Sequence, residues 1–187
     1  MGDKIPEMAP ESTFKYVATN ITQKVHRASH PSIDPSRPEL SQNGRTVLIT
    51  GGSAGIGFYI AKAFITAGAS TIVITGRRQG QFDFAETSLK EYAPKNGTRV
   101  ISEKSDVNDP TAVDQLWEQL AKQDTVVDAL ALNAARFAVD KPLLELGFQH
   151  VWKSFEANVR PLLQFSERFK LQQREGRPGV GFGFFDA

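Results

Sequence analysis

The sequence predicts an α/β fold built on a doubly wound parallel sheet, and three observations support it. From residue 45 onward, apolar strand-like runs alternate with amphipathic helix-like segments, the order expected of a parallel sheet with helices on both faces. The run from Ser70 to Thr75 is β-branched and apolar, which is typical of a strand buried on both faces. A glycine-rich turn connects the first apolar run to the first helix-like segment.

Each element follows from its local pattern. Strands are expected at about 45–50, 70–75, 98–102 and 126–132. Helices are expected at about 55–67, at about 83–93, from Pro110 onward, near 142–146 and at about 148–173. Gly68 and Pro94 end the first two helices, and Asp109 is expected to cap the third because a proline follows it.

Three helices carry an apolar side at helical spacing. In the first helix, it consists of Ile56, Tyr59, Ile60, Ala63 and Phe64. In the third, it consists of Val113, Leu116, Trp117 and Leu120. In the long last helix, it consists of Phe148, Trp152, Phe155, Val159, Leu162, Leu163 and Phe169. Pro161 should kink the last helix, because its ring removes one backbone hydrogen bond.

Composition narrows the class of protein. The 187 residues are 40% hydrophobic and 23% charged, which fits one globular domain. The 22 basic and 21 acidic residues leave a net charge of +1, so nothing points to nucleic acid. Without cysteine, and with histidines that lack metal-ligand spacing, neither a disulfide nor a metal site is expected. No run approaches the ~18 apolar residues of a membrane span and no signal peptide is evident, so the cytosol is the expected location.

Two segments flank the alternating pattern. Residues 1–44 are expected to form an N-terminal extension, proline-rich near its end, and residues 45–187 the domain. The extension is expected to be a surface arm or partly disordered, with one or two helical turns between Thr13 and Val25. After a turn at residues 176–179, the chain ends on a stretch with three phenylalanines and two glycines. Glycine weakens a strand, so pairing of this stretch beside the strand at 126–132 stays open.

The turn from Thr50 to Gly57 reads Thr-Gly-Gly-Ser-Ala-Gly-Ile-Gly. A strand, a glycine turn and a helix together are the context that a dinucleotide fingerprint needs. Glycine permits a positive φ and lets backbone N–H groups approach a diphosphate, which the positive end of the following helix also attracts. A tight turn that binds nothing, with the serine capping the helix, is the alternative. The residues expected to line the phosphate path are Gly51, Ser53, Gly55, Ile56 and Gly57.

The spacing Thr-Gly-x-x-x-Gly-x-Gly resembles the short-chain dehydrogenase/reductase family, and three further motifs keep the family's order. They are Asp106 after a strand-like run, Asn133-Ala134-Ala135 after another, and Asn158 in the long helix. The resemblance runs from about residue 45 to about residue 170. It implies a Rossmann-like domain that binds a nicotinamide dinucleotide.

The family's catalytic Tyr-x-x-x-Lys does not occur in these residues. The tyrosines are Tyr16, Tyr59 and Tyr92, and the residues four positions after them are Asn20, Ala63 and Asn96. In the family, the tyrosine donates a proton to the carbonyl, and the lysine lowers its pKa. The resemblance therefore implies the cofactor-binding half of such an enzyme, incomplete at its C-terminal side.

The resemblance also implies roles for the downstream motifs. Asp106 would contact the adenine amino group, and a turn or capping role fits it equally well. Asn133 would tie neighbouring strands together while Ala134 passes close to the cofactor ribose, and Ala135 stands where the family has glycine. Asn158 matches the family's active-site asparagine, a role that is vestigial without the lysine. Satisfying a backbone group near the proline kink is the alternative.

The end of the second strand bears on the choice of cofactor. Enzymes that use NAD place an acidic residue there, whereas this chain has Gly76-Arg77-Arg78. A guanidinium group can hold a 2′-phosphate by charge-assisted hydrogen bonds worth about 1.5–3 kcal/mol. NADP is therefore expected to bind roughly ten- to a hundredfold more tightly than NAD. The alternative is two solvated arginines in a surface loop, with Arg77 the stronger candidate of the two.

Three readings of function follow. The first is an NADP-dependent oxidoreductase acting on an alcohol or carbonyl group, present as its cofactor-binding half and weak or inactive as written. The second is a non-catalytic nucleotide-binding module that forms homo- or hetero-oligomers through the long helix at 148–173. The third is a truncated gene product. Substrate and reaction direction are not predicted.

Overall fold

The computed structural model describes residues 30–93, 97–136 and 141–172. The helical turns expected before Val25 and the C-terminal stretch expected after residue 175 lie outside these residues. The chain divides into two units, residues 1–34 and 35–187, which are described separately. In the first unit, Pro31–Ile33 form a short 3-10 helix, η2, and the His30 Nδ1 atom accepts a hydrogen bond from the Ser32 N–H at 3.2 Å. The domain boundary after residue 44 stays a prediction.

The second unit contains a four-stranded parallel sheet in the order β3-β2-β1-β4. Its strands are β1 (Thr46–Ile49), β2 (Thr71–Gly76), β3 (Arg99–Lys104) and β4 (Ala129–Ala131). Val47 lies opposite Ile72 of β2 on one side and opposite Ala129 of β4 on the other. The chain builds outward from β1 to β3 and then crosses back to β4, so the strand order reverses beside β1.

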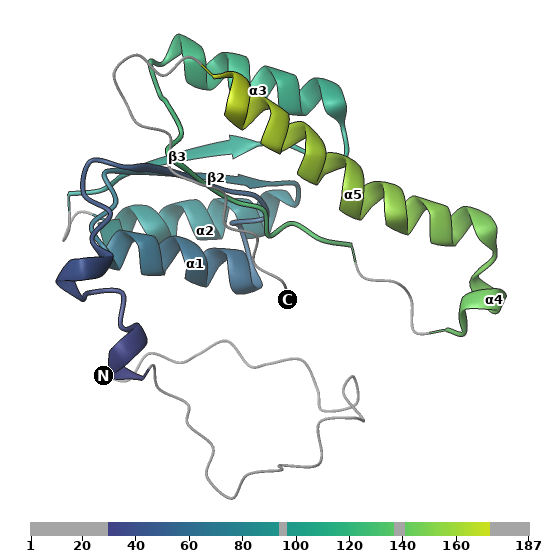
Figure 1. The fold of residues 1–187 in the computed structure, drawn as a ribbon, viewed down its shortest axis with the longest axis horizontal. Helices are drawn as coiled ribbons and strands as arrows, with labels where there is room; N and C mark the ends of the chain where they lie inside the picture. The colour runs from purple at the N-terminus through teal and green to yellow at the C-terminus, as the bar shows by residue number, and fades with distance from the viewer. Residues whose placement is uncertain (1–29, 94–96, 137–140, 173–187) are drawn as a thin grey trace, which may run out of the picture. The chain divides into compact units, whose positions relative to one another are not determined.

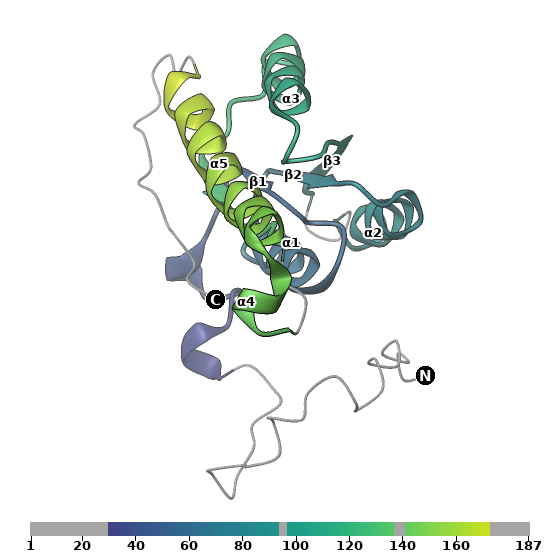
Figure 2. The ribbon, with the colours of Figure 1, turned by 90° about the vertical axis from the view of Figure 1, so that its right-hand side faces the viewer.

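Helices cover both faces of this sheet, as Figures 1 and 2 show. One face carries α1 (Gly55–Thr66) and α2 (Gln79–Tyr92), and the other carries α3 (Pro110–Lys122) and α5 (Phe148–Leu171). The short helix α4 (Leu143–Leu146) precedes α5, and the 3-10 helix η3 (Pro38–Leu40) precedes β1. The predicted α/β fold with a doubly wound, Rossmann-like parallel sheet is confirmed.

Alternate residues of the central strand face opposite layers of core. Val47 and Ile49 pack into the layer under α1 and α2, while Leu48 packs into the layer under α3 and α5. β2 is buried from Ile72 to Gly76, as its apolar sequence predicted. Since a strand covered on both faces has no polar side, β1 and β2 are recognisable from sequence alone.

The start of α3 matches its prediction. The Asp109 carboxylate accepts a hydrogen bond from the Thr111 N–H at 2.9 Å, and Pro110 is the first helical residue. Such an N-cap satisfies one of the backbone donors that a helix start leaves free. The predicted apolar side of this helix, Val113, Leu116, Trp117 and Leu120, is buried.

The boundaries of α2 and β4 differ most from the prediction, and β3 extends two residues past its expected end, to Lys104. α2 begins at Gln79 rather than near residue 83, because its first turn is closed by a hydrogen bond from the Phe82 N–H to the Arg78 carbonyl at 2.9 Å. β4 is confined to residues 129–131. Before β4, the Thr46 N–H donates a hydrogen bond to the Asp128 carboxylate instead of to a backbone carbonyl. After β4, the Asn133 N–H donates to the carbonyl of Ala131 in the same segment, which ends the pairing with β1.

The apolar side predicted for α5 lies mostly on its exposed face. Phe148, Trp152, Phe155, Val159 and Leu163 are exposed, whereas Ala157, Pro161, Phe165 and Phe169 are buried. The helix therefore has two apolar stripes, and only the second packs against the sheet and α3. In α1, Ile56 and Tyr59 are likewise exposed, while the buried residues are Gly57, Ala61 and Ile65.

Among the described residues, no helix combines the length and apolar character needed to span a membrane.

Candidate functional site

A groove of about 480 Å³ runs across the carboxyl ends of the strands. Its walls come from the segments that follow all four strands, with Ala157 of α5 at one side. The volume lies in the range of ligand sites, roughly 300–1,000 Å³. In open α/β sheets, ligands bind where the strand order reverses, and this groove opens beside β1, where the reversal occurs.

The segment between β1 and α1 forms one side of the groove. Gly51 has a φ of +67° and Gly55 a φ of +52°, backbone conformations that residues with a side chain rarely adopt. α1 starts after Ala54 with no side-chain capping bond and no acidic residue in its first turn. The N–H groups at this helix start therefore remain available to an anion, and the helix dipole favours one there.

Gly57 lies buried beneath this turn rather than in the groove. A Cβ atom at this position would stand 2.3 Å from the Gly51 carbonyl oxygen and 2.6 Å from the Asn133 Nδ2 atom. The Asn133 Nδ2 donates to the Thr50 carbonyl at 3.1 Å and to the Gly51 carbonyl at 3.4 Å. The absence of a side chain thus lets α1, the turn and the end of β4 close onto one another.

Thr50 ties the turn to the segment after β4. Its hydroxyl oxygen accepts hydrogen bonds from the Asn133 N–H and the Ala134 N–H, both at 3.0 Å. Asn133 therefore joins neighbouring strands, as its structural interpretation predicted, and it also lines the groove with Ala134 and Ala135. Ala135 does not adopt a positive φ, because among described non-glycine residues only Asp124 does.

The opposite side of the groove carries positive charge. Arg77 and Arg78 follow β2 and are both exposed. Gly76 lets this side approach the glycine turn, since a Cβ there would lie 2.5 Å from the Ser53 Oγ atom. α2 starts after Arg78 without a side-chain cap, so its free N–H groups add to the positive potential beside the guanidinium groups.

Asp106 lies beside the groove rather than among the residues that line it. Its Oδ2 atom is 3.8 Å from the Arg77 Nη1 atom. Its Oδ1 atom accepts the Asn108 N–H at 3.0 Å and the Asn108 Nδ2–H at 3.3 Å. This is the hydrogen-bond pattern of an Asx turn, so the turn role predicted as an alternative is realised.

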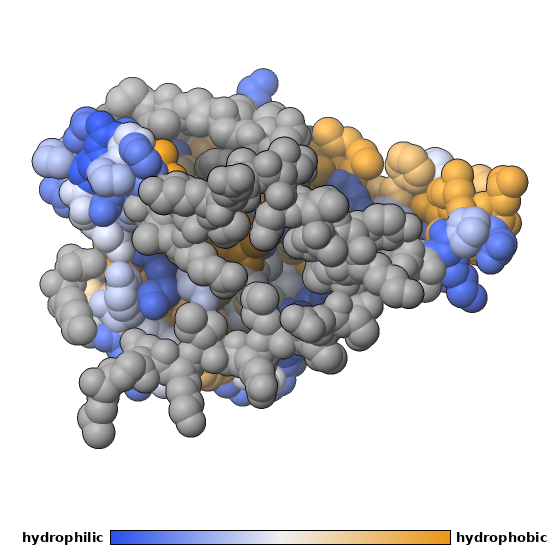
Figure 3. All heavy atoms as spheres, turned by 90° about the horizontal axis from the view of Figure 1, so that it is seen from below, coloured by the Kyte–Doolittle hydropathy of each residue, from blue (hydrophilic) through white to orange (hydrophobic). Residues whose placement is uncertain are grey.

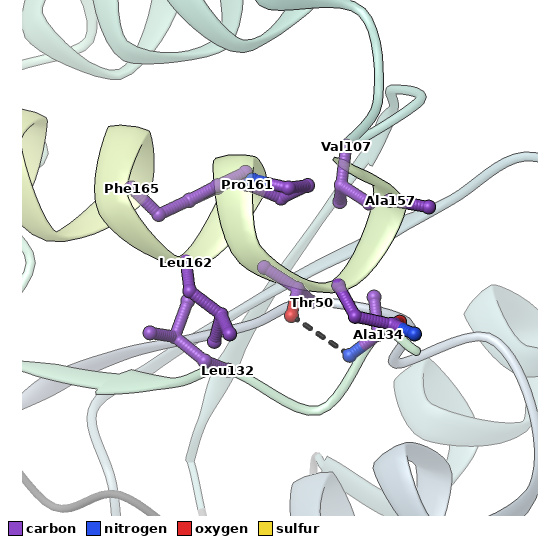
Figure 4. Close-up of a pocket in the computed structure, with 9 residues that line it drawn as sticks. Thr50, Val107, Leu132, Ala134, Ala157, Pro161, Leu162 and Phe165 are labelled. Atoms are coloured by element: carbon purple, nitrogen blue, oxygen red, sulfur yellow. Dashed lines mark hydrogen bonds between the residues drawn. The ribbon is translucent and has the colours of Figure 1, made fainter. Parts of the chain in front are cut away.

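Asn158 lines a small cavity between α5 and the strand ends. Figure 4 shows this cavity with Thr50, Ala134 and Phe165 among its labelled walls. The cavity measures about 10 Å³, close to the space that one water molecule needs. The Asn158 Oδ1 atom accepts the Arg136 N–H at 2.7 Å, and its Nδ2 donates to the Arg136 carbonyl at 2.8 Å. The backbone groups that Asn158 satisfies therefore belong to the segment after β4, and not to α5, which continues through Pro161 without a break.

Thr75 and Asn108, which the sequence did not single out, are among the other residues that line the groove. Thr75 is fully buried and its hydroxyl has no hydrogen-bond partner among the described residues; the Asn108 Oδ1 atom is likewise unpaired there. A buried polar atom without a partner is costly, so these atoms suit a bound polar group. The signal for Thr75 was present, since a threonine ends an otherwise apolar strand just before Gly-Arg-Arg.

The geometry therefore brings together most of the residues predicted to hold a dinucleotide. Those that line the groove are Gly51, Ser53, Gly55, Ile56, Arg77, Arg78, Asn133 and Ala134. Uncapped helix N–H groups, two guanidinium groups and an unpaired buried hydroxyl fit a long ligand with several phosphates. Within the described residues, no three His, Asp or Glu side chains gather into a metal-binding group.

Comparison with known proteins gives a consistent result. Residues 45–179 match the family model described as short chain dehydrogenase. The chain is 29% identical over 154 residues to a short chain dehydrogenase of Monascus purpureus, covering 81% of this chain and 50% of that protein. It is 31% identical to a short chain dehydrogenase/reductase of Macrophomina phaseolina, covering 70% of this chain and 74% of that protein.

A solved structure is similar as well. The L-sorbose reductase of Gluconobacter frateurii, determined with NADPH and L-sorbose, has a TM-score of 0.60 and 28% identity. The match covers 69% of this chain and 47% of that protein. Like the match to the Monascus protein, it spans about half of the relative's length.

Proposed function

Because the chain belongs to the short-chain dehydrogenase/reductase family of oxidoreductases, we propose that its groove binds NADP(H) in preference to NAD(H). The observation that carries the proposal is the uncapped start of α1 behind a positive-φ glycine turn, facing two arginines across the groove. Backbone donors there suit the diphosphate, and the guanidinium groups suit a 2′-phosphate.

Each part of the dinucleotide is assigned to residues of the groove or beside it. The N–H groups from Gly51 to Ile56 hold the diphosphate, with Ser53 and Gly55 along its path, and Gly57 lets the turn pack closely beneath it. Asn133 and Ala134 lie along the ribose, and Asp106 approaches the adenine. Arg77, with Arg78 beside it, receives the 2′-phosphate. That the Gluconobacter frateurii relative was solved with NADPH supports this choice of cofactor.

The reaction class is an oxidation or reduction at an alcohol or carbonyl carbon. NADP(H) would supply or accept the hydride, while the chain's own residues bind and orient the dinucleotide. No tyrosine in these 187 residues is followed four positions later by lysine, so within them Asn158 has no tyrosine-lysine pair to act with. The 187-residue polypeptide alone is therefore proposed to bind NADPH with little turnover, as the cofactor-binding half of such an enzyme.

Titration of the purified chain with each dinucleotide tests this proposal. The quenching of tryptophan fluorescence should give a Kd for NADPH roughly ten- to a hundredfold below that for NADH. NADPH should also raise the midpoint of thermal unfolding, because a ligand that binds the folded state stabilises it. No binding of either dinucleotide at millimolar concentration would refute the assignment, and carbonyl-dependent NADPH oxidation at an ordinary rate would refute the low turnover.

A second role, self-association through α5, is favoured by the exposed stripe on that helix. Figure 3 shows hydrophobic surface gathered over α4 and the start of α5. Within the stripe, Phe148 stacks on Trp152 with ring centroids 6.0 Å apart. Exposed apolar patches of this kind mark interaction surfaces.

The charges beside the stripe suit a second copy of the chain. One flank of α5 carries Lys153, Glu156, Arg160 and Glu167 in order, with alternating sign. In an antiparallel pair centred near Val159, Lys153 would face Glu167 of the second copy, while Glu156 and Arg160 are paired with each other within each chain at 2.7 Å. A two-fold interface needs this kind of self-complementarity.

Sedimentation at increasing protein concentration tests the second role. Phe155→Glu should shift the chain to monomer, whereas Phe84→Glu, at an equally exposed phenylalanine of α2, should not. A chain that is monomeric at every concentration would exclude self-association and leave a different partner for a pulldown experiment.

The cytosolic location stays a prediction that cell fractionation would test. Sequencing the transcript beyond Gly179 would test the truncated-product alternative.

A further inference from the structure

The ion pair between Arg77 and Asp106 concerns the choice between dinucleotides. We propose that Asp106 lowers the preference for NADP by competing with the 2′-phosphate for the Arg77 guanidinium. This inference rests on the proposed function and assigns Asp106 a role in specificity that is separate from any contact with adenine.

Asp106 is held in place by Asn108, which is itself held by α5. Its Oδ1 atom accepts both hydrogen bonds from Asn108. Asn108 is held in turn by Arg160 of α5, whose Nη2 donates to the Asn108 carbonyl at 2.6 Å. The carboxylate is therefore fixed by a contact between residues that are 52 positions apart, and its Oδ2 atom remains directed toward Arg77.

Arg77 is the more freely placed partner. Its side chain is 59% exposed, against 42% for Asp106, and their 3.8 Å separation is longer than a hydrogen bond. Exposed pairs of this kind are weak. A phosphate group offers Arg77 shorter, bidentate and charge-assisted hydrogen bonds, so it would replace the carboxylate. The carboxylate still lowers the gain, because its attraction for Arg77 must be given up when the phosphate binds that side chain.

The two dinucleotides separate this effect from any contact with adenine. NADPH and NADH carry the same adenine, so a change in that contact alters both Kd values equally. The ratio of Kd for NADH to Kd for NADPH depends on the 2′-phosphate and on the charges around it. This ratio is the quantity to measure.

The test uses the full chain with Asp106→Asn, which keeps an oxygen for the Asn108 N–H and removes the charge. The ratio should rise roughly two- to fivefold, the range expected for an exposed ion pair. The rise should shrink in about 0.5 M salt, which screens exposed charges. In an Arg77→Ala background, Asp106→Asn should leave the ratio unchanged, because the effect acts through Arg77.

Asp109→Asn is the matched control. It removes an equal charge from the same loop and keeps the cap of α3, and it should not change the ratio. Asp106→Ser, a second uncharged variant, should repeat the rise if the asparagine variant does not fold.

An unchanged or lower ratio in both variants would overturn the inference while leaving NADPH binding intact. An equal rise in the Arg77→Ala background would overturn the route through Arg77. If the unaltered chain binds neither dinucleotide, the proposed function is wrong and the inference falls with it.

Discussion

The two sides of the groove are built in different ways. The glycine side, Thr50 to Gly57 with Asn133, is made of backbone and closely packed atoms, and Thr50 and Gly57 are buried. The arginine side, Gly76 to Arg78 with Asp106, presents long charged side chains, and that of Arg77 is 59% exposed. Backbone donors suit what every dinucleotide shares, the diphosphate, whereas exposed charges suit the group that distinguishes one dinucleotide from another.

The two sides of the groove should therefore respond differently to amino-acid substitution. Substitutions on the glycine side are expected to alter folding and the affinity for both dinucleotides together. Those on the arginine side are expected to alter the affinity for one dinucleotide and its salt dependence, with little effect on folding.

The largest effect is expected from Gly57→Ala. The added methyl group would meet the Gly51 carbonyl oxygen at 2.3 Å, so the turn must shift, at a cost of up to about 3 kcal/mol of unfolding free energy. Binding of both dinucleotides should be lost together, as measured by fluorescence titration and thermal unfolding. Gly80→Ala in α2, where a Cβ meets nothing within 4 Å, is the control and should not destabilise the fold. Normal binding by Gly57→Ala would contradict the role assigned to the glycine side.

Arg77→Ala should give the next largest effect. Loss of charge-assisted hydrogen bonds to a phosphate predicts about tenfold weaker NADPH binding, with NADH unchanged. The unfolding midpoint should stay within a degree or two, because exposed substitutions rarely change stability by more than about 0.5 kcal/mol. If Arg77→Ala weakened the binding of NADPH and NADH equally, the arginine side would not be the part of the groove that distinguishes the two dinucleotides.

Asn133→Ala should weaken dinucleotide binding less than Arg77→Ala does. Unlike Arg77→Ala, it should lower stability and affect both dinucleotides alike. It removes the donor to the Thr50 and Gly51 carbonyls, which predicts a loss of about 1 kcal/mol of stability. Both dinucleotides should weaken by a similar factor, and their ratio should not move. A selective loss of NADPH binding would place Asn133 on the arginine side instead. Asn43→Ala, at an exposed residue outside the groove, serves as the control.

Glu103→Gln on β3 should have the smallest effect. It should alter only the pH dependence of stability, because Glu103 belongs to neither side of the groove. Burial raises the pKa of the Glu103 carboxyl, the neighbouring Glu86 charge adds to the rise, and a hydrogen bond from Gln123 opposes it. A raised folded-state pKa favours folding while the group is protonated, and this contribution is lost as the pH rises through that pKa.

The glutamine variant should therefore be slightly more stable than the unaltered chain at neutral pH, by less than about 0.5 kcal/mol. The gain should disappear near pH 4, where both chains carry an uncharged group, and urea unfolding at the two pH values would measure it. Both dinucleotide affinities should be unaltered. A larger gain at pH 4 than at neutral pH would contradict the direction of the pKa shift.

Some features of the structure could be predicted because their cause is local. The cap of α3 depends on Asp109 and Pro110, which are adjacent in sequence. The buried strand β2 is recognisable from its own composition, and the glycine turn from its position between strand and helix. Other features depend on distant neighbours. The Asp106 carboxylate is hydrogen-bonded by Asn108 and lies 3.8 Å from the Arg77 guanidinium, and no pattern in the sequence indicates the contact with Arg77.

Hydrophobic periodicity and glycine conformation act over a few residues. The succession of strands and helices along the chain, the buried strands and the place of the glycine turn could therefore be predicted without the structure. The inward packing of one of the two apolar stripes on α5, and the burial of polar atoms such as the Thr75 hydroxyl without a described partner, could not. Burial is a property of surfaces that meet across the fold, and residues far apart in the chain create those surfaces.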